Sequence, residues 1–231
     1  GETLSEDEIK ALTALIYKPL PEMPRWGVGE IEATRVVNVR SDPRARPRFT
    51  ADPLNLFVVV ESGDHHVSIL DGDKLEVLHR FQSRFALHGG PKFTPDGRFV
   101  YFGSRDGWIT KFDLYTFEII AEVRAGLNTR NIALSGDGRF VAVANYLPHS
   151  VVILDAEDLS PRKVIAASDA RGTATSRVSA VYQAPMRKSF IVALKDLPEI
   201  WEISYDENAA PIFTGLVHSH EKGMVEGLPA S

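Results

Sequence analysis

Hydrophobic positions follow two different patterns in this chain, one close to its start and another from about Asn55 onward. Near the start, apolar residues recur at the three- and four-residue spacing of a single helix face: Ile9, Leu12, Ile16 and, less regularly, Leu15. Ser5 and Glu8 occupy the N-cap and N3 positions of a capping box. Prolines begin at Pro19, and proline interrupts a helix. We therefore predict a helix that starts after Ser5 and ends near Lys18.

The second pattern consists of short apolar runs bounded by turns, and it repeats. Four of the runs carry a phenylalanine at the same place: Phe57, Phe99, Phe140 and Phe190. Their spacings are 42, 41 and 50 residues, the last with an insertion. Aspartates that end a strand recur in step at Asp71, Asp113 and Asp155, 42 residues apart both times. A period of about 40–45 residues with several short strands in each unit is typical of β-propeller blades.

The sequence thus predicts an all-β fold, a β-propeller of about four blades in residues 27–231, with one α-helix before it in residues 1–26. β-Meanders that do not close into a ring, and a closed ring of four blades, are the alternatives. We favour part of a larger ring, because the first helix has no predicted partner and the last segment is polar without a closing strand. An open blade edge invites association, so we expect the remaining blades in the same molecule.

Strand direction sorts the loops of each unit between two faces. With four antiparallel strands, the turn between the second and third strands and the crossover to the next unit share one face. On this face the sequence gathers cations, a histidine and a tyrosine: Arg84, His88, Arg105, Arg130, Tyr146, Arg177 and Lys195. Arginine binds carboxylates through two parallel hydrogen bonds, and imidazole binds metals. The pattern favours a flat, polyanionic ligand whose metal takes an imidazole, although a single arginine in a turn is usually a solvated charge.

Composition narrows the chemistry further. The chain has no cysteine, which excludes disulfides, thiolate metal sites and the C-x-x-C-H attachment of haem c within these residues. Its formal net charge of −5 disfavours a nucleic-acid partner, and no apolar run approaches the length of a membrane span. The motifs of common hydrolases and of phosphate-binding loops are absent. His218 and His220, with Glu221, form a weaker candidate for a metal site.

Several stretches resemble the propeller that carries haem d1 in cytochrome cd1 nitrite reductase. Residues 85–88, 96–101 and 104–107 are similar to the stretch of that family that carries its proximal histidine. Residues 55–57 and 69–72 are similar to the blade before it, and residues 176–180 and 190–195 are similar to a later blade. The resemblance covers roughly residues 35–205. It implies a ring of eight blades, of which this chain would hold the first half.

Other stretches distinguish among the haem d1 proteins. The first helix with residues 24–27 resembles the end of a cytochrome c domain, and residues 87–91, 127–131 and 144–149 look most like the dihydro-haem d1 dehydrogenase of haem d1 biosynthesis. That resemblance implies a periplasmic oxidoreductase that turns a propionate side chain of dihydro-haem d1 into an acrylate and passes electrons to haem c in a preceding domain. Nitrite reduction and non-catalytic haem d1 carriage are the alternatives.

The resemblance also assigns expected roles to single residues. His88 would be the axial ligand of the d1 iron, and Tyr146 would line the pocket. The carboxylates of the macrocycle would be held by five cations: Arg84, Arg105, Arg130, Arg177 and Lys195. Arg46 matches a family arginine less closely. The general base and the distal groups are expected outside this chain, and the expected partners are the tetrapyrrole, nitrite reductase and other haem d1 maturation proteins.

Overall fold

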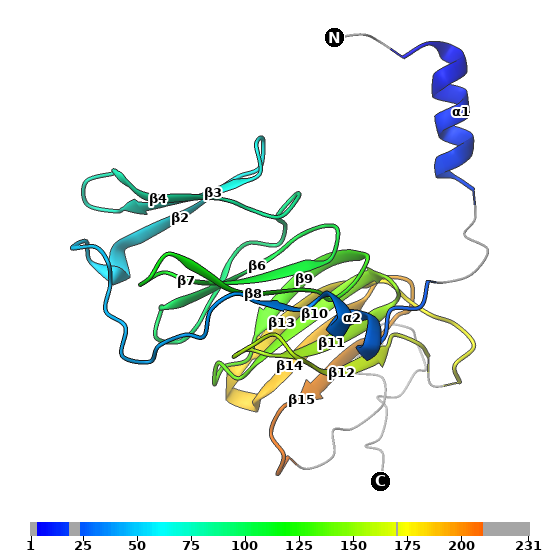
Figure 1. Cartoon of the computed structure of the whole chain (residues 1–231). Coiled ribbons are helices and arrows are strands. Elements are labelled where there is room, and N and C mark those ends of the chain that lie inside the picture. Colours follow the sequence, from blue (N-terminus) through cyan, green and yellow to red (C-terminus); the bar gives the residue numbers. More distant parts are fainter. Residues whose placement is uncertain (1–3, 19–23, 170, 210–231) are drawn as a thin grey trace, which may run out of the picture.

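The computed structural model describes residues 4–18, 24–169 and 171–209, and most of its regular structure is antiparallel sheet (Figure 1). Four sheets follow one another along the chain, and we call them blades one to four. Blade one contains β2 (Leu56–Glu61), β3 (His66–Asp71) and β4 (Val77–Gln82), and blade two contains β5 (Lys92–Phe93), β6 (Phe99–Gly103), β7 (Trp108–Asp113) and β8 (Glu118–Arg124). Blade three contains β9 (Asn128–Leu134), β10 (Phe140–Leu147), β11 (Ser150–Asp155) and β12 (Pro161–Ala166), and blade four contains β13 (Val178–Ala184), β14 (Ser189–Leu194) and β15 (Ile200–Ser204). Short 3-10 helices span Pro53–Asn55 and Pro185–Arg187.

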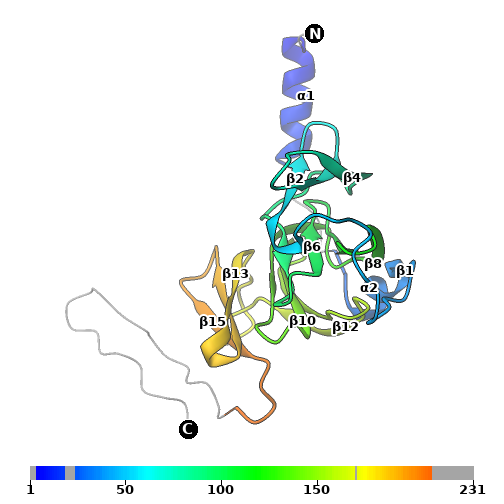
Figure 2. The same ribbon diagram turned by 90° about the vertical axis from the view of Figure 1, so that its left-hand side faces the viewer.

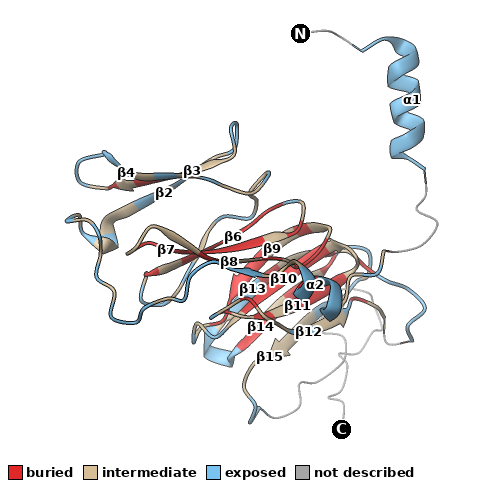
Figure 3. Ribbon diagram, in the orientation of Figure 1, coloured by how far each residue is buried: buried red, intermediate tan, exposed pale blue. Residues whose placement is uncertain are grey.

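Consecutive blades pack face to face, as the second view makes clear (Figure 2). One hydrophobic cluster lies between blades one and two, with Ile69 against Phe112. A second lies between blades two and three, and a third between blades three and four, where Ala142 and Phe190 belong to the same cluster. Buried residues concentrate in the strands of blades two and three (Figure 3). This is the stacking of a β-propeller, so the predicted fold class is confirmed.

The predicted period reappears in the backbone. Asp71, Asp113 and Asp155 end β3, β7 and β11, and each carboxylate accepts a hydrogen bond of 2.7–2.9 Å from the N–H two residues on. Four residues after each aspartate the chain adopts a positive φ of 57–61°, at Leu75, Phe117 and Leu159. The same turn is therefore built three times, 42 residues apart.

The first helix, α1 (Glu6–Ile16), is confirmed together with its capping box between Ser5 and Glu8. Its apolar residues do not meet the blades, because Leu15 is 67% exposed and Ile16 73% exposed. Whether α1 belongs to a cytochrome c domain stays a prediction, as do the domain limits at residues 26 and 27.

A second helix, α2 (Val28–Thr34), was not predicted, and the expectation of a single helix was wrong. Only Ile31 of this helix is buried, in the cluster between blades two and three, so its seven residues give too short a periodic signal. Trp26 donates a 2.9 Å hydrogen bond from Nε1 to the carbonyl of Arg124. The following strand, β1 (Val36–Val37), joins blade two beside β8 as a fifth strand.

The β6–β7 turn contains a glycine that the fold requires. Gly107 has φ +96°, and a Cβ there would lie 1.9 Å from the carbonyl oxygen of Gly126. Gly107→Ala should therefore lower the free energy of unfolding by about 1–3 kcal/mol, measured by urea denaturation. Gly63→Ala is the control, because nothing lies within 4 Å of a Cβ at that position. Equal unfolding midpoints for the two variants would contradict this reading of the turn.

Candidate functional site

Backbone hydrogen bonds place the predicted loops at one end of the blades. The N–H groups of Ser83, Ala125 and Ala167, in the segments that leave blades one, two and three, donate to the carbonyls of His65, Gly107 and His149 at 2.8–2.9 Å. These acceptors lie in the β2–β3, β6–β7 and β10–β11 turns of the same blades. The shared face deduced from strand direction is confirmed, and we call it the crossover face. The turns β5–β6, β7–β8, β9–β10 and β11–β12 form the opposite face.

Between blades two and three, the crossover face brings together His88, Arg105 and Arg130. The His88 N–H donates to the carbonyl of Gly103 at 2.8 Å, and its imidazole Nε2 contacts the Nη1 group of Arg130. A guanidinium can only donate, so Nε2 is the acceptor in this contact. Burial, together with the charges of Arg130 and Arg105, lowers the pKa of His88. The lowered pKa and the contact with Arg130 both favour the neutral imidazole with a lone pair at Nε2.

Arg105 and Arg130 keep their positive charges uncompensated. Among the ion pairs of residues 4–18, 24–169 and 171–209, neither guanidinium has a carboxylate within 4.0 Å. Arg105 is exposed in the β6–β7 turn, and its N–H donates to the carbonyl of Ala86 at 3.0 Å. The backbone thus fixes the turn while the side chain is available to an anion.

Between blades three and four, the same face brings together Tyr146, Arg177 and Lys195. The Nζ group of Lys195 donates to the phenol oxygen of Tyr146 at 3.4 Å, and the Cζ atom of Arg177 lies 5.4 Å from the centre of the Tyr146 ring. The Arg177 guanidinium also makes two hydrogen bonds to Asp196, of 2.9 and 2.5 Å. The Arg177 guanidinium holds the pKa of the Asp196 carboxyl far below its usual range. A ligand carboxylate would therefore have to share Arg177 with Asp196, whereas Lys195 is exposed.

Arg84 lies apart from both groups, between blades one and two. Its guanidinium makes hydrogen bonds of 2.9 and 2.6 Å to Glu122 and lies 3.8 Å from the centre of the Trp108 ring. Arg84 thus already has a carboxylate partner within the protein. The predicted contact of Arg84 with a ligand would require the Arg84–Glu122 ion pair to break.

Arg46 is not brought to the crossover face. The residues on either side of it are tied to the opposite end of blade two: the Asp42 carbonyl accepts a 2.9 Å bond from Arg98, and the Arg48 N–H donates to Tyr115 at 2.9 Å. Two smaller departures concern Arg130 and Tyr146, which were expected in loops. They lie inside strands, because β9 and β10 continue past an irregular register to Asn128 and Leu147.

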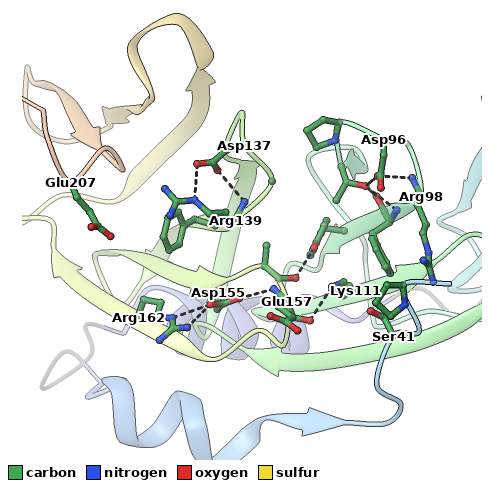
Figure 4. Close-up of a pocket in the computed structure, with 18 residues that line it drawn as sticks. Ser41, Asp96, Arg98, Lys111, Asp137, Arg139, Asp155, Glu157, Arg162 and Glu207 are labelled. Carbon is green, nitrogen blue, oxygen red and sulfur yellow. Dashed lines mark hydrogen bonds and ion pairs between the residues drawn. The ribbon is translucent and has the colours of Figure 1, made fainter. Parts of the chain in front are cut away.

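A hollow of about 1010 Å³ lies at the opposite face between blades two and three (Figure 4). Its charges are largely satisfied within the protein. Arg139 pairs with Asp137 and Arg162 pairs with Asp155. The buried Lys111 donates to the carbonyl of Glu157 at 2.9 Å. Its volume alone would favour this hollow as the ligand-binding site. The uncompensated cations and the imidazole of His88 favour the crossover face instead.

The sequence model of the cytochrome D1 heme domain matches residues 51–221. The chain belongs to the cytochrome D1 heme domain family. It is 60% identical over 213 residues to dihydro-heme d1 dehydrogenase from Pseudomonas aeruginosa, covering 90% of this chain and 42% of that protein. The solved structure of dihydro-heme d1 dehydrogenase NirN in complex with DHE matches with a TM-score of 0.82 and 60% identity, over 88% of this chain and 44% of that one.

The chain therefore spans less than half the length of the proteins in these two matches. A more distant match, with the β-propeller domain of Myceliophteria thermophila Cps50 (Swd1), has a TM-score of 0.53 and 13% identity over 69% of this chain and 52% of that one, and it supports the fold alone. No helix in the described part of the domain is long and apolar enough to cross a membrane.

Two residues of the domain's crossover face were missed in the sequence. Asp196 follows Lys195 directly, and Lys92 stands four residues after His88 at the start of β5. The Lys92 Nζ group donates to the carbonyls of Gly89 and Gly90 at 2.7 and 3.1 Å. Its position on the same crossover was the signal that could have found it. The weaker metal candidate at His218, His220 and Glu221 lies outside the described residues, and within them no cluster of three or more His, Cys, Asp or Glu side chains could hold a metal.

Proposed function

We propose that the full-length protein is an oxidoreductase of haem d1 biosynthesis that dehydrogenates a propionate side chain of dihydro-haem d1 to an acrylate. The observation that carries the proposal is the group formed by His88, Arg105 and Arg130 on the crossover face. It occurs in a chain 60% identical to a dihydro-heme d1 dehydrogenase. The chain spans 42% of that relative, so the proposal concerns the whole protein.

The side chains of the crossover face fit an iron macrocycle that bears carboxylates. A neutral imidazole with its lone pair at Nε2 is the form that binds a metal, and the lowered pKa of His88 and its contact with Arg130 favour that form. Guanidinium groups bind carboxylates with two parallel bonds, and Arg105 and Arg130 have no carboxylate partner among the described residues. Lys195 adds a point charge beside Tyr146. His88 would hold the iron, and these three cations would hold the carboxylates.

Ligand binding requires one exchange of partners within the protein. Arg130 occupies Nε2 of His88, and the imidazole can bind iron only after this guanidinium has moved. Once released, the Arg130 guanidinium can pair with a carboxylate on the same macrocycle. The two changes offset each other, because one charge-assisted hydrogen bond of Arg130 replaces another.

The overall reaction balances as a two-electron oxidation. Conversion of CH₂–CH₂ to CH=CH releases two protons and two electrons, and haem c in another part of the protein would take the electrons one at a time. When bound, the macrocycle supplies the side chain that is oxidised and a conjugated path for the electrons. We expect the proton acceptor and the distal groups outside this chain. We also propose a periplasmic location, with nitrite reductase and other haem d1 maturation proteins as partners.

Incubation of the full-length protein with dihydro-haem d1 tests the proposal. The expected result is a product lighter by two hydrogen atoms in mass spectrometry, together with a change in the visible spectrum. Lys163→Met, an exposed change in β12, is the control variant. Binding without conversion would favour a carrier, and nitrite reduction by the haem d1 complex would favour a nitrite reductase. A spectrum of the macrocycle that the protein leaves unchanged would overturn the binding site itself.

A further inference from the structure

The loop that follows His88 is held by a lysine side chain. Lys92 is partly buried at the start of β5, and its Nζ group donates to two backbone carbonyls, of Gly89 at 2.7 Å and of Gly90 at 3.1 Å. Both acceptors lie immediately after His88. The ammonium group therefore bonds to the loop rather than joining one strand to another.

The loop needs such support because its backbone is unusual. Gly89 and Gly90 have consecutive positive φ angles of +86° and +72°, which glycine adopts with little steric penalty but without any side chain of its own to hold them. Gly89 also packs closely, since a Cβ there would lie 2.8 Å from Oδ1 of Asn131. On its other side, the His88 N–H is fixed to the Gly103 carbonyl. Without Lys92, the described hydrogen bonds would fix the backbone beside His88 at that side only.

The charge of Lys92 has no other evident use in the described structure. No carboxylate among residues 4–18, 24–169 and 171–209 lies within ion-pair distance of its Nζ group. Burial lowers the pKa of Lys92, so the position works against the charged form. A partly buried ammonium group whose bonds go to two loop carbonyls contributes mainly by fixing the path of that loop.

We propose that Lys92 is a positioning residue that holds the Gly89–Gly90 loop and thereby sets the orientation of the His88 imidazole for iron. This inference rests on the proposed function of His88 as the axial ligand. Groups that orient a ligating histidine typically change metal affinity about 10–100-fold when they are removed. Lys92 would orient the imidazole through the backbone and not through a hydrogen bond to the ring.

The experiment compares Lys92→Met, Lys92→Arg and the exposed control Lys163→Met in the full-length protein. In the unliganded protein, amide exchange at His88, whose N–H is bonded to the Gly103 carbonyl beside this loop, should be about tenfold faster in Lys92→Met than in the wild type and close to wild type in Lys92→Arg. Titration with haem d1 should show about tenfold weaker binding to Lys92→Met, with altered visible bands of the bound form, and at least partial rescue by Lys92→Arg.

The outcomes separate this inference from the proposed function. If the wild type does not bind haem d1, the proposed function fails. If the wild type binds and Lys92→Met has the same exchange rates, affinity and bands, the role of Lys92 is overturned. A lower affinity with unchanged bands and unchanged amide exchange at His88 would also overturn it, because that result would mean that Lys92 contacts the macrocycle directly.

Discussion

Replacement of His88 by alanine should weaken haem d1 binding to the full-length protein at least about tenfold and shift the visible bands of the bound form, because it removes the proposed imidazole ligand of the iron. His88 contributes the neutral Nε2 of the group formed with Arg105 and Arg130. The measurement is a spectroscopic titration of the purified protein. His66→Ala is the matched control on the same face, since His66 bonds only locally, to the carbonyl of Asp64 at 2.9 Å.

A cavity variant makes this prediction sharper. In His88→Gly, added imidazole can take the vacant ligand position, and it should restore the wild-type bands. Bands that do not change in His88→Ala, or that free imidazole does not restore in His88→Gly while the protein stays folded, would contradict iron ligation by His88. Circular dichroism of both variants distinguishes loss of the ligand from loss of the fold.

Replacement of Asp113 by alanine should lower the free energy of unfolding by about 3–5 kcal/mol, since it leaves the Arg98 guanidinium buried without its carboxylate. The pair has its shortest contact at 2.6 Å, and the two side chains are only 8% and 1% exposed. Asp113 also accepts the N–H of Tyr115 at 2.8 Å. Urea denaturation followed by circular dichroism measures the loss.

The repeat supplies a control for this experiment. Asp155 occupies the equivalent strand end in blade three, but its partner Arg162 is 58% exposed. Asp155→Ala should therefore cost clearly less stability than Asp113→Ala, because water solvates the remaining arginine. In the double variant Arg98→Met/Asp113→Leu, part of the lost stability should return, since neither charge stays buried alone. Equal losses at Asp113 and Asp155 would contradict the role assigned to burial.

The propeller was predictable because blades one, two and three repeat one hydrogen-bonding pattern. The strand-end aspartates are visible in the sequence, and each caps the same turn in the structure. The shared face of the crossovers followed from strand direction alone. By contrast, α2 left no recognisable pattern, because a helix of seven residues with a single buried side chain lacks a measurable period.

Whether each arginine has a carboxylate partner was not predictable, because that depends on contacts between residues distant in sequence. Arg84 meets Glu122, 38 residues away, and Arg177 meets Asp196, 19 residues away. Arg105 and Arg130 have no such partner among the described residues. All four look alike in the sequence. The position of Arg46 was not predictable either, since the bonds of Asp42 and Arg48 to blade two determine where it lies.

The short segment that contains α2 and β1 has a consequence for how the protein folds. Its Thr34 side chain accepts the N–H of Arg124 across 90 residues of sequence, and all of blade one lies inside that loop. Repeat proteins often grow by adding one unit to the last, with contacts only between neighbours. Here β1 completes blade two before blade one begins in the sequence, so the loop must close for the second sheet to reach its full width. The contacts of β1 and Thr34 therefore close a long loop around blade one, and a growing chain cannot finish its second sheet until β8 has been synthesised.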